Sequence, residues 1–294
     1  MDLIKNKKKI NIGITGHRGV IGTDFITLNK KFNFITFDGN LTNKQSVYKW
    51  IKNNSFEALI HFAAIVPIQD VEKNFSKAKK VNYGGTKHIV DAIIKFKPKN
   101  LGWFFYASTS HVYKGSNKKL NENSKKIPIT RYGLTKLLAE NYILKKAKKT
   151  KILFCIGRIF SYFHHKQKSS YFIQSVFKKI YEKNKKKITF YGLNQYRDIL
   201  GSKDVCDAIN FLYKKKAKGI YNIASGKKTK LSKVVNILAK SKNIKIVNKD
   251  NLYGKKFKNI NIIGDIRKIR KIGWRPKDSL NYVLKNYLKN KLKK

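Results

Sequence analysis

The chain has 294 residues, of which 41% are hydrophobic and 13% aromatic, enough to bury a sizeable core and too many for a disordered protein. Its formal net charge of +51 comes almost entirely from lysines spread along the chain, whereas arginine, which recognises phosphates and bases through paired hydrogen bonds, is scarce. We therefore interpret the lysines as solvated surface residues and expect no nucleic-acid partner, although their field attracts anionic substrates.

Short apolar runs alternate with helical patterns along the first 160 residues. Strands are predicted at 9–16, 32–38, 58–64, 101–109 and 151–160. Helices are predicted at 20–32, 44–54, 82–96 and 131–147. Because the predicted strands are apolar on both faces and alternate with helices, we expect a doubly wound parallel sheet in an α/β fold.

The alternation of strands and helices breaks down after residue 160. Helices are predicted at 171–184, 202–216 and 231–241, a strand at 219–225, and a last helix in the tail. We interpret 166–294 as a smaller, mixed α/β substrate-binding region, with elements near 198–224 returning to the first domain.

Glycines Gly16, Gly19 and Gly22 lie three residues apart in the turn between the first predicted strand and helix. Such glycines allow a tight turn, close approach of the backbone to a pyrophosphate, and close packing of helix against strand. The helix N-terminus then offers free N–H groups to the phosphates. We expect a Rossmann domain over residues 1–165 whose turn binds a dinucleotide. The residues expected to bind it are Gly16, Arg18, Gly19, Val20, Ile21 and Gly22.

Asp38 ends the second predicted strand, where a carboxylate can hold the adenosine ribose hydroxyls of NAD and repel the 2′-phosphate of NADP. Arg18 has the opposite preference, because its guanidinium could pair with that phosphate. NAD is therefore favoured and NADP is left open. A simple turn residue is the alternative role for Asp38.

Tyr132 and Lys136 are four residues apart, and therefore on one face of the predicted helix. The spacing alone means little, because seven tyrosines in this chain are followed by a lysine at that interval. The setting distinguishes this pair. Pro128 and Gly133 flank Tyr132, and Ser108–Ser110 end the preceding strand, at the edge of the sheet where ligands bind.

Eight segments resemble the extended short-chain dehydrogenases/reductases, in particular their sugar-nucleotide epimerase/dehydratase branch. In chain order they are TGHRGVIG, HFAA, ASTSHVY, P-x-x-x-YG-x-TK, GRIFSYF, YRDIL followed by KDV, YNIASG and IGWRP. The resemblance implies that Tyr132 is the general acid/base, and that Lys136 holds the nicotinamide ribose and tunes Tyr132. It implies that Thr109 hydrogen-bonds the reacting sugar oxygen, with Ser108 and Ser110 as alternatives.

The same resemblance implies further contacts. His61–Ala64, including Phe62, Ala63 and Ala64, would line the cofactor, and Asn82, also expected among the cofactor-binding residues, would help order the neighbouring helix. Arg197 would bind the substrate pyrophosphate, unless it belongs to a surface ion pair. Asp198 would support the loop that carries Arg197. The residues expected to contact the substrate are Ser110, His111, Ser161 and Arg197.

The expected chemistry places a condition on the site. A free tyrosine titrates near ~10 and a useful base near ~7, so about 4 kcal/mol must come from the surroundings. A lysine ammonium ~4 Å away supplies about 1 kcal/mol in bulk water but about 4 kcal/mol at an effective dielectric constant of ~20. The pair therefore requires a site shielded from water.

The chain departs from its relatives after Thr109. Dehydratases of this branch usually place an acidic residue there, whereas this chain has Ser110 and His111, which argues against 4,6-dehydration by the usual acid/base pair. His111 is either an additional acid/base or a loop histidine held by a partner. Ser161 stands where relatives carry asparagine.

These observations lead to one functional hypothesis and one alternative. The resemblance implies an NAD(P)-dependent homodimer that transfers hydride at a ring carbon of a nucleotide sugar, with epimerase preferred over keto-sugar reductase. The alternative is a non-catalytic dinucleotide-sensing or polyanion-binding protein on the same fold.

The remaining features of the sequence concern location and metals. No stretch approaches 18 apolar residues, and the lysine-rich N-terminus lacks the apolar run of a signal peptide, so we expect a cytoplasmic protein without a membrane partner. Cys155 and Cys206 lack the spacing of a metal or redox pair, and Cys155 is expected to be a buried free thiol. His164 and His165 lack a carboxylate pattern, so no metal is expected.

Overall fold

The computed structural model describes residues 9–181, 186–240, 242–249 and 261–292. Residues 1–8, for which no signal peptide is expected, lie outside these ranges. So do the last residues of the helices predicted at 171–184 and 231–241.

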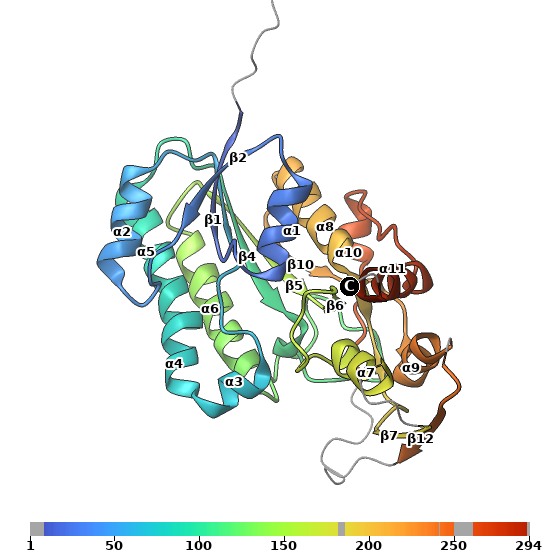
Figure 1. The fold of residues 1–294 in the computed structure, drawn as a ribbon. Helices are drawn as coiled ribbons and strands as arrows, with labels where there is room; N and C mark the ends of the chain where they lie inside the picture. Colours follow the sequence, from blue (N-terminus) through green and yellow to red (C-terminus); the bar gives the residue numbers. More distant parts are fainter. Residues whose placement is uncertain (1–8, 182–185, 241, 250–260, 293–294) are drawn as a thin grey trace, which may run out of the picture.

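A six-stranded sheet forms the centre of the molecule, and all its neighbouring strands are parallel. Figure 1 shows it edge-on with helices on either side, which confirms the predicted doubly wound Rossmann fold. Its strands in spatial order are β10 (Gly219–Ile223), β5 (Leu153–Ile159), β4 (Trp103–Thr109), β3 (Ala58–His61), β1 (Asn11–Thr15) and β2 (Asn33–Phe37).

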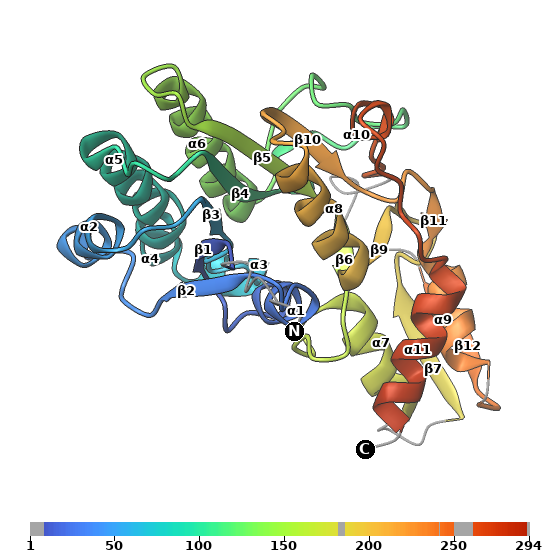
Figure 2. The same ribbon diagram turned by 90° about the horizontal axis from the view of Figure 1, so that it is seen from above.

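Helices cover both faces of this sheet (Figures 1 and 2). One face packs against α2 (Lys44–Asn53), α5 (Gly85–Phe96) and α6 (Arg131–Ala147), and the other against α1 (Val20–Leu28) and α8 (Ser202–Lys214). The central strands are therefore buried on both sides, which explains their unbroken apolar sequences.

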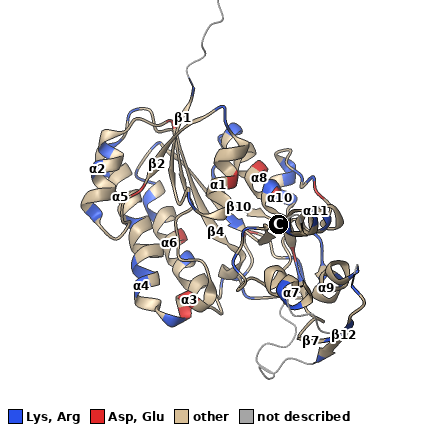
Figure 3. Ribbon diagram, viewed as in Figure 1, with Lys and Arg blue, Asp and Glu red and all other residues tan. Residues whose placement is uncertain are grey.

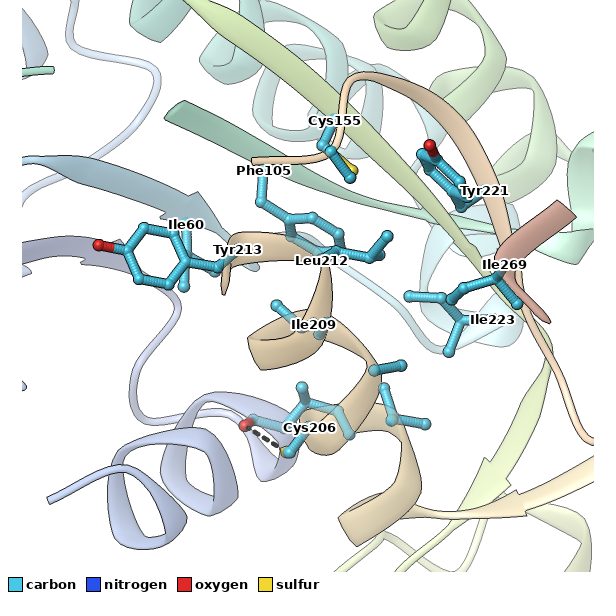
Figure 4. Packing of buried hydrophobic residues seen from close by; sticks show 14 of the residues in the cluster. Ile60, Phe105, Cys155, Cys206, Ile209, Leu212, Tyr213, Tyr221, Ile223 and Ile269 are labelled. Carbon is cyan, nitrogen blue, oxygen red and sulfur yellow. Dashed lines mark hydrogen bonds between the residues drawn. The ribbon is translucent and has the colours of Figure 1, made fainter. Parts of the chain in front are cut away.

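The core beneath α8 is shown in Figure 4, where Phe105 and Cys155 of the sheet face Ile209 and Leu212 of the helix. Cys155 is buried and free, as predicted. Cys206 is also buried and free, and its Sγ lies 3.8 Å from the carbonyl oxygen of Ile21.

A second part of the molecule has its own core between helices and short strand pairs. Its helices are α7 (Phe172–Tyr181), α9 (Leu231–Ala239) and α11 (Leu280–Leu292). Its paired strands are β7 (Lys187–Tyr191) with β12 (Lys245–Lys249), β6 (Ser161–Phe163) with β9 (Ile199–Gly201), and β8 (Tyr196–Arg197) with β11 (Thr229–Lys230). The short helix α10 (Arg267–Lys271) leads toward the last helix.

Several elements were not predicted. The segment after β3 forms α3 (Ile68–Lys73), α4 (Phe75–Lys79) and a π-helical turn, η1 (Lys80–Gly84), and Thr109 is followed by a 3₁₀ turn, η2 (Ser110–Val112). The strand predicted at 58–64 ends at His61 because the chain leaves the sheet there. In Figure 3 lysine and arginine recur on helices of both faces, consistent with a dispersed surface charge.

Candidate active site

A cavity of about 1010 Å³ opens at the carboxyl ends of the central strands, between the sheet and the second part of the molecule. One wall is formed by the turn after β1 and the ends of β4 and β5. The other is formed by β6, the segment that leads into α7, and residues of β8, β9 and α9. This edge of a doubly wound sheet is where ligands bind in such folds.

Almost all the residues predicted for the site line this one cavity. They come from segments up to 181 positions apart in sequence, from Gly16 to Arg197. Those that line it are Gly16, Arg18, Gly19, Val20, Ile21, Gly22, Asp38, Phe62, Ala63, Ala64, Thr109, Ser110, His111, Tyr132, Lys136, Ser161 and Arg197.

The glycine turn brings three backbone segments into contact. Gly16 has φ +74°, a conformation that side chains disfavour, and a Cβ there would lie 2.5 Å from the backbone nitrogen of Ala63. A Cβ on Gly22 would overlap the carbonyl oxygen of Gly16. Helix α1 begins directly after Gly19, so its N-terminus faces the cavity. The turn therefore presents bare backbone and a helix dipole to a ligand.

Asp38 and Arg18, predicted to favour different cofactors, form an ion pair at the rim of the cavity. Arg18 Nη2 lies 2.5 Å from Asp38 Oδ1, and His17 Nε2 lies 3.4 Å from the same oxygen. The hydroxyl of Thr36 donates to Asp38 Oδ2 at 2.9 Å. The carboxylate is thus held in place and its charge is partly compensated.

His61 supports the site from within strand β3. The prediction that it lines the cofactor is wrong, because β3 is buried on both faces and His61 is fully buried within it. Its Nδ1 lies 2.6 Å from Thr15 Oγ1 and its Nε2 lies 2.9 Å from Thr86 Oγ1. Burial, assisted by the charge of Lys136, lowers the pKa of His61 to about 3, so the ring is neutral.

Asn82 was predicted to be among the cofactor-binding residues, but it is 1% exposed, does not line the cavity and instead fixes its wall. Its side chain accepts a hydrogen bond from Ile65 N at 2.8 Å and donates to Ile65 O at 2.9 Å and to Thr135 Oγ1 at 3.1 Å. The π-helical turn η1 carries this side chain. Asn82 therefore joins the loop after β3 to helix α6.

Tyr132 and Lys136 lie in the first turns of α6, which begins where the hydroxyl of Thr130 accepts a hydrogen bond from Gly133 N. Tyr132 is 7% exposed and Lys136 is 2% exposed. The Nζ of Lys136 lies 4.2 Å from the centre of the Tyr106 ring. Both groups are therefore removed from bulk water, as the proposed chemistry requires.

Burial controls the pKa values of this pair. It raises the pKa of Tyr132 above its ordinary value, an effect that Tyr171 reinforces and a hydrogen bond with the Thr109 side chain opposes. It lowers the pKa of Lys136 to about 7, although the carboxylate of Glu140 acts in the opposite direction. The expected lowering of the tyrosine pKa is not present in the protein alone, because loss of hydration on burial dominates.

A buried charge network lies behind Lys136 and was missed from the sequence. Arg158 Nη2 and Glu140 Oε2 are 2.6 Å apart, with both side chains at most 1% exposed. Ser108 donates its hydroxyl to Glu140, and Arg158 Nη1 donates to Tyr113 Oη at 2.9 Å. Ser108 is thus engaged away from the ligand, which favours Thr109 over Ser108 as the hydroxyl that meets a substrate.

His111 follows Thr109 in the turn η2, and its ring lies 5.9 Å from the Tyr132 ring, centre to centre. Its Nδ1 is buried and has no hydrogen-bond partner among the residues that the structure describes. Burial, with a smaller effect from Arg197, lowers its pKa to about 4. The expectation that a protein partner holds the ring is therefore not met.

Several cavity residues went unnoticed in the sequence, among them the polar residues Tyr162, Gln167 and Tyr171. Burial raises the pKa of Tyr162, and the nearby phenols of Tyr171 and Tyr132 add to that rise. The available signal was the Tyr- and Ser-containing segment 161–172, which runs into the helix predicted at 171–184.

Arg197 and Asp198 differ in their surroundings. Arg197 reaches the cavity and donates to Gln195 Oε1 at 2.8 Å. Asp198 is fully buried and accepts hydrogen bonds from Ser225 N, Gly226 N and Gly264 N. It therefore fixes the loop that carries Arg197, in line with its expected role.

Across the described ranges, no helix is long and apolar enough to cross a membrane. The same residues contain no group of three or more His, Cys, Asp or Glu placed to hold a metal ion.

Comparison with known proteins identifies the family. The family model described as GDP-mannose 4,6 dehydratase matches residues 21–287. A protein of Methanocaldococcus jannaschii, provisionally named UDP-glucose 4-epimerase, is 26% identical over 271 residues, which span 90% of this chain and 86% of that protein.

Two solved structures show the same fold. RMD from Pseudomonas aeruginosa, complexed with NADPH, has a TM-score of 0.85 at 20% identity and covers 96% of this chain and 98% of its own. The UDP-glucose 4-epimerase of Thermus thermophilus, in complex with NAD, has a TM-score of 0.83 at 16% identity. The match covers 95% of this chain and 98% of that one. The chain belongs to the GDP-mannose 4,6 dehydratase family of the extended short-chain dehydrogenases/reductases, which comprises NAD-dependent sugar-nucleotide epimerases, dehydratases and reductases.

Proposed function

We propose that this protein is an NAD(P)-dependent nucleotide-sugar epimerase or keto-sugar reductase that uses Thr109, Tyr132 and Lys136. The observation that carries the proposal is their convergence with the glycine turn on one cavity, where Tyr132 and Lys136 are shielded from water. A tyrosine–lysine pair on the surface would gain too little from its electrostatic interaction to act as a base.

The residues of the cavity fit a dinucleotide. The glycines leave no Cβ where the pyrophosphate would approach, and the N-terminus of α1 offers it N–H groups. Asp38 would hold the adenosine ribose and Lys136 the nicotinamide ribose, and the similar structures named above carry NADPH or NAD. The bound nicotinamide would supply or accept a hydride, and its oxidised ring would add positive charge beside Tyr132.

The proton chemistry belongs to three side chains. Tyr132 Oη takes or returns the proton of the reacting sugar hydroxyl, and Thr109 Oγ1 orients that oxygen. Negative charge on Tyr132 favours the ammonium form of Lys136, so the two groups titrate as a coupled pair. A phenolate and an ammonium ~4 Å apart attract each other by about 4 kcal/mol at an effective dielectric constant of ~20, which is enough to offset much of the burial effect.

The substrate would lie between the two parts of the molecule. Arg197 is placed to bind its pyrophosphate, and Ser110, His111 and Ser161 to contact the sugar. Residues 1–165 would then bind the cofactor and 166–294 mainly the substrate. By the family resemblance we expect a homodimer, which light scattering of the purified protein tests.

The test combines product analysis with one substitution. The protein is incubated with UDP-, dTDP- and GDP-linked sugars and their 4-keto forms, with NAD or NADPH. We expect conversion, and we expect Tyr132→Phe to lower kcat by about 10²–10⁴-fold, the usual contribution of a general acid/base. Tyr83→Phe is the matched control, because Tyr83 has a lysine at the same spacing but lies outside the cavity.

Undiminished conversion by Tyr132→Phe would refute this assignment. Absence of any conversion, together with strongly salt-dependent nucleic-acid binding, would instead favour the polyanion-binding alternative.

A further inference from the structure

The segment 161–171 forms part of one wall of the cavity, and Tyr162 and Tyr171 within it line the cavity. His164 belongs to the same segment but does not line the cavity. Its Nε2 instead lies 3.5 Å from Asp24 Oδ1, and the two side chains are 13% and 18% exposed. His164 thus connects the wall of the cavity to a residue far away in the sequence.

Asp24 belongs to α1, the helix whose N-terminus would meet the pyrophosphate of the cofactor. The helix begins at Val20, so Asp24 lies about one turn after the residues of α1 that line the cavity. The contact with His164 therefore runs between the proposed cofactor helix and the wall on the substrate side. Any movement of the segment 161–171 away from α1 has to break this contact.

Hydrogen bonds at both backbone groups of His164 fix its position. Its N–H donates to Gln167 Oε1 at 3.1 Å, and its carbonyl oxygen accepts from Gln174 Nε2 at 3.1 Å. Gln174 on α7 accepts in turn from Tyr287 Oη of α11 at 2.9 Å. Gln167 lines the cavity and donates to the carbonyl oxygen of Tyr162 at 3.3 Å. The turn that carries the His164 ring is therefore also part of the cavity wall.

We propose that His164 is a positioning residue for the substrate. By pairing with Asp24 it holds the segment 161–171 against α1, and so keeps Tyr162 and Tyr171 in place around a bound nucleotide sugar. The inference rests on the proposed function, because the nucleotide sugar is the substrate assigned there. It concerns binding and not proton transfer, since His164 does not line the cavity.

The charges around His164 make this contact depend on pH. Burial lowers the pKa of His164, and His165 and Lys166 of the same segment add to this effect, whereas the carboxylate of Asp24 raises the pKa. Cys206 of α8 also lies near Asp24, but burial raises the pKa of its thiol, which therefore carries no charge. Because its pKa is lowered, the His164 ring takes up a proton only below pH ~6.5. The ion pair is therefore formed in mildly acidic solution and lost as the pH rises.

Substrate affinity as a function of pH tests the inference. UDP-, dTDP- and GDP-glucose are titrated into the protein with bound NAD by calorimetry, at pH ~5.5 and pH ~8. Asp24→Asn and His164→Asn should each weaken binding about three- to fivefold at the lower pH and less than about twofold at the higher pH. The double variant should bind as the single variants do, because both changes remove the same contact. Thr27→Ala is the control, since Thr27 is exposed about one turn further along α1 and its hydroxyl donates to Thr23 O at 2.9 Å. It should bind as wild type does.

Hydrogen exchange of the ligand-free protein separates the contact from its use. Peptides that cover 161–171, followed by mass spectrometry, should exchange faster in Asp24→Asn and His164→Asn than in wild type at pH ~5.5, and equally at pH ~8. Equal exchange at the lower pH would overturn the contact. Faster exchange with unchanged sugar affinity would overturn the positioning role. If the exchange responds as expected but wild type binds none of the three sugars, the contact is confirmed, and the proposed function, with the positioning role that rests on it, is refuted.

Discussion

Replacing Lys136 with methionine should make the cofactor-free protein more stable while it removes the proposed activity. Lys136 is 2% exposed on α6, and burial lowers its pKa from 10.5 to about 7. The folded protein must therefore either desolvate an ammonium or release its proton. Methionine has a similar length and no charge, so it removes this unfavourable contribution to folding.

The size of the effect follows from the two pKa values. At pH 7 the difference between the unfolded and folded lysine corresponds to about 4 kcal/mol of destabilisation. The ammonium recovers about 1 kcal/mol through its contact with the ring of Tyr106, 4.2 Å away. The net gain expected for Lys136→Met is about 3 kcal/mol, or about 5 °C in Tm for a chain of this length.

The pH dependence has a definite sign. Because the folded pKa lies below the unfolded one, the penalty is fully present below pH ~7 and fades as the pH rises toward ~10.5. The advantage of the variant should therefore roughly halve between pH 7 and pH ~9. Differential scanning calorimetry of the cofactor-free proteins measures this difference in stability. The control is Lys49→Met, which replaces an exposed lysine on helix α2 and should leave the stability within about 0.5 kcal/mol of wild type.

Two results would refute this reasoning. One is a Lys136→Met variant that is less stable than wild type at pH 7. The other is a gain that does not change with pH. Either would mean that the folded protein keeps the ammonium hydrated or well paired.

Two further substitutions test the scaffold of the site. Glu140→Gln should destabilise the protein by about 3–5 kcal/mol in denaturant titrations, because it leaves the fully buried Arg158 without its charge partner. The double variant Glu140→Leu, Arg158→Leu should recover part of this loss. A Glu140→Gln protein as stable as wild type would contradict the prediction. Gly22→Ala should weaken NADH or NADPH binding at least about tenfold by fluorescence titration, because its Cβ overlaps the backbone of the glycine turn. Gly102→Ala, with no atom within 4 Å of an added Cβ, should bind normally, and equal binding by both variants would show that the turn adapts.

The sheet and most of the cavity residues could be predicted because they depend on local patterns. Alternating apolar strands and helices fix a doubly wound sheet, and such a sheet brings the ends of its strands to one edge. Gly16 and Thr109 end predicted strands, and Tyr132 lies in the first turn of the predicted helix that follows Thr109, so their convergence followed from topology.

Features that depend on distant partners could not be predicted. The helices α3 and α4 were missed because each is short and mostly polar, with one fully buried apolar residue each, Val71 and Ala78, too few to show a period within either helix. The Arg18–Asp38 ion pair and the burial of His61 require knowledge of which segments are neighbours. The raised pKa of Tyr132 depends on how deeply α6 is covered, a quantity that no motif encodes.

Strand β10 has a consequence for how the protein is made. It pairs with β5 at one border of the sheet, and α8, which precedes it, covers the hydrophobic residues shown in Figure 4. During synthesis β5 is complete at residue 159 but has no outer neighbour until residue 223 has left the ribosome. Until then the nascent chain carries an open strand edge and an uncovered apolar layer, the combination that promotes aggregation of newly made proteins.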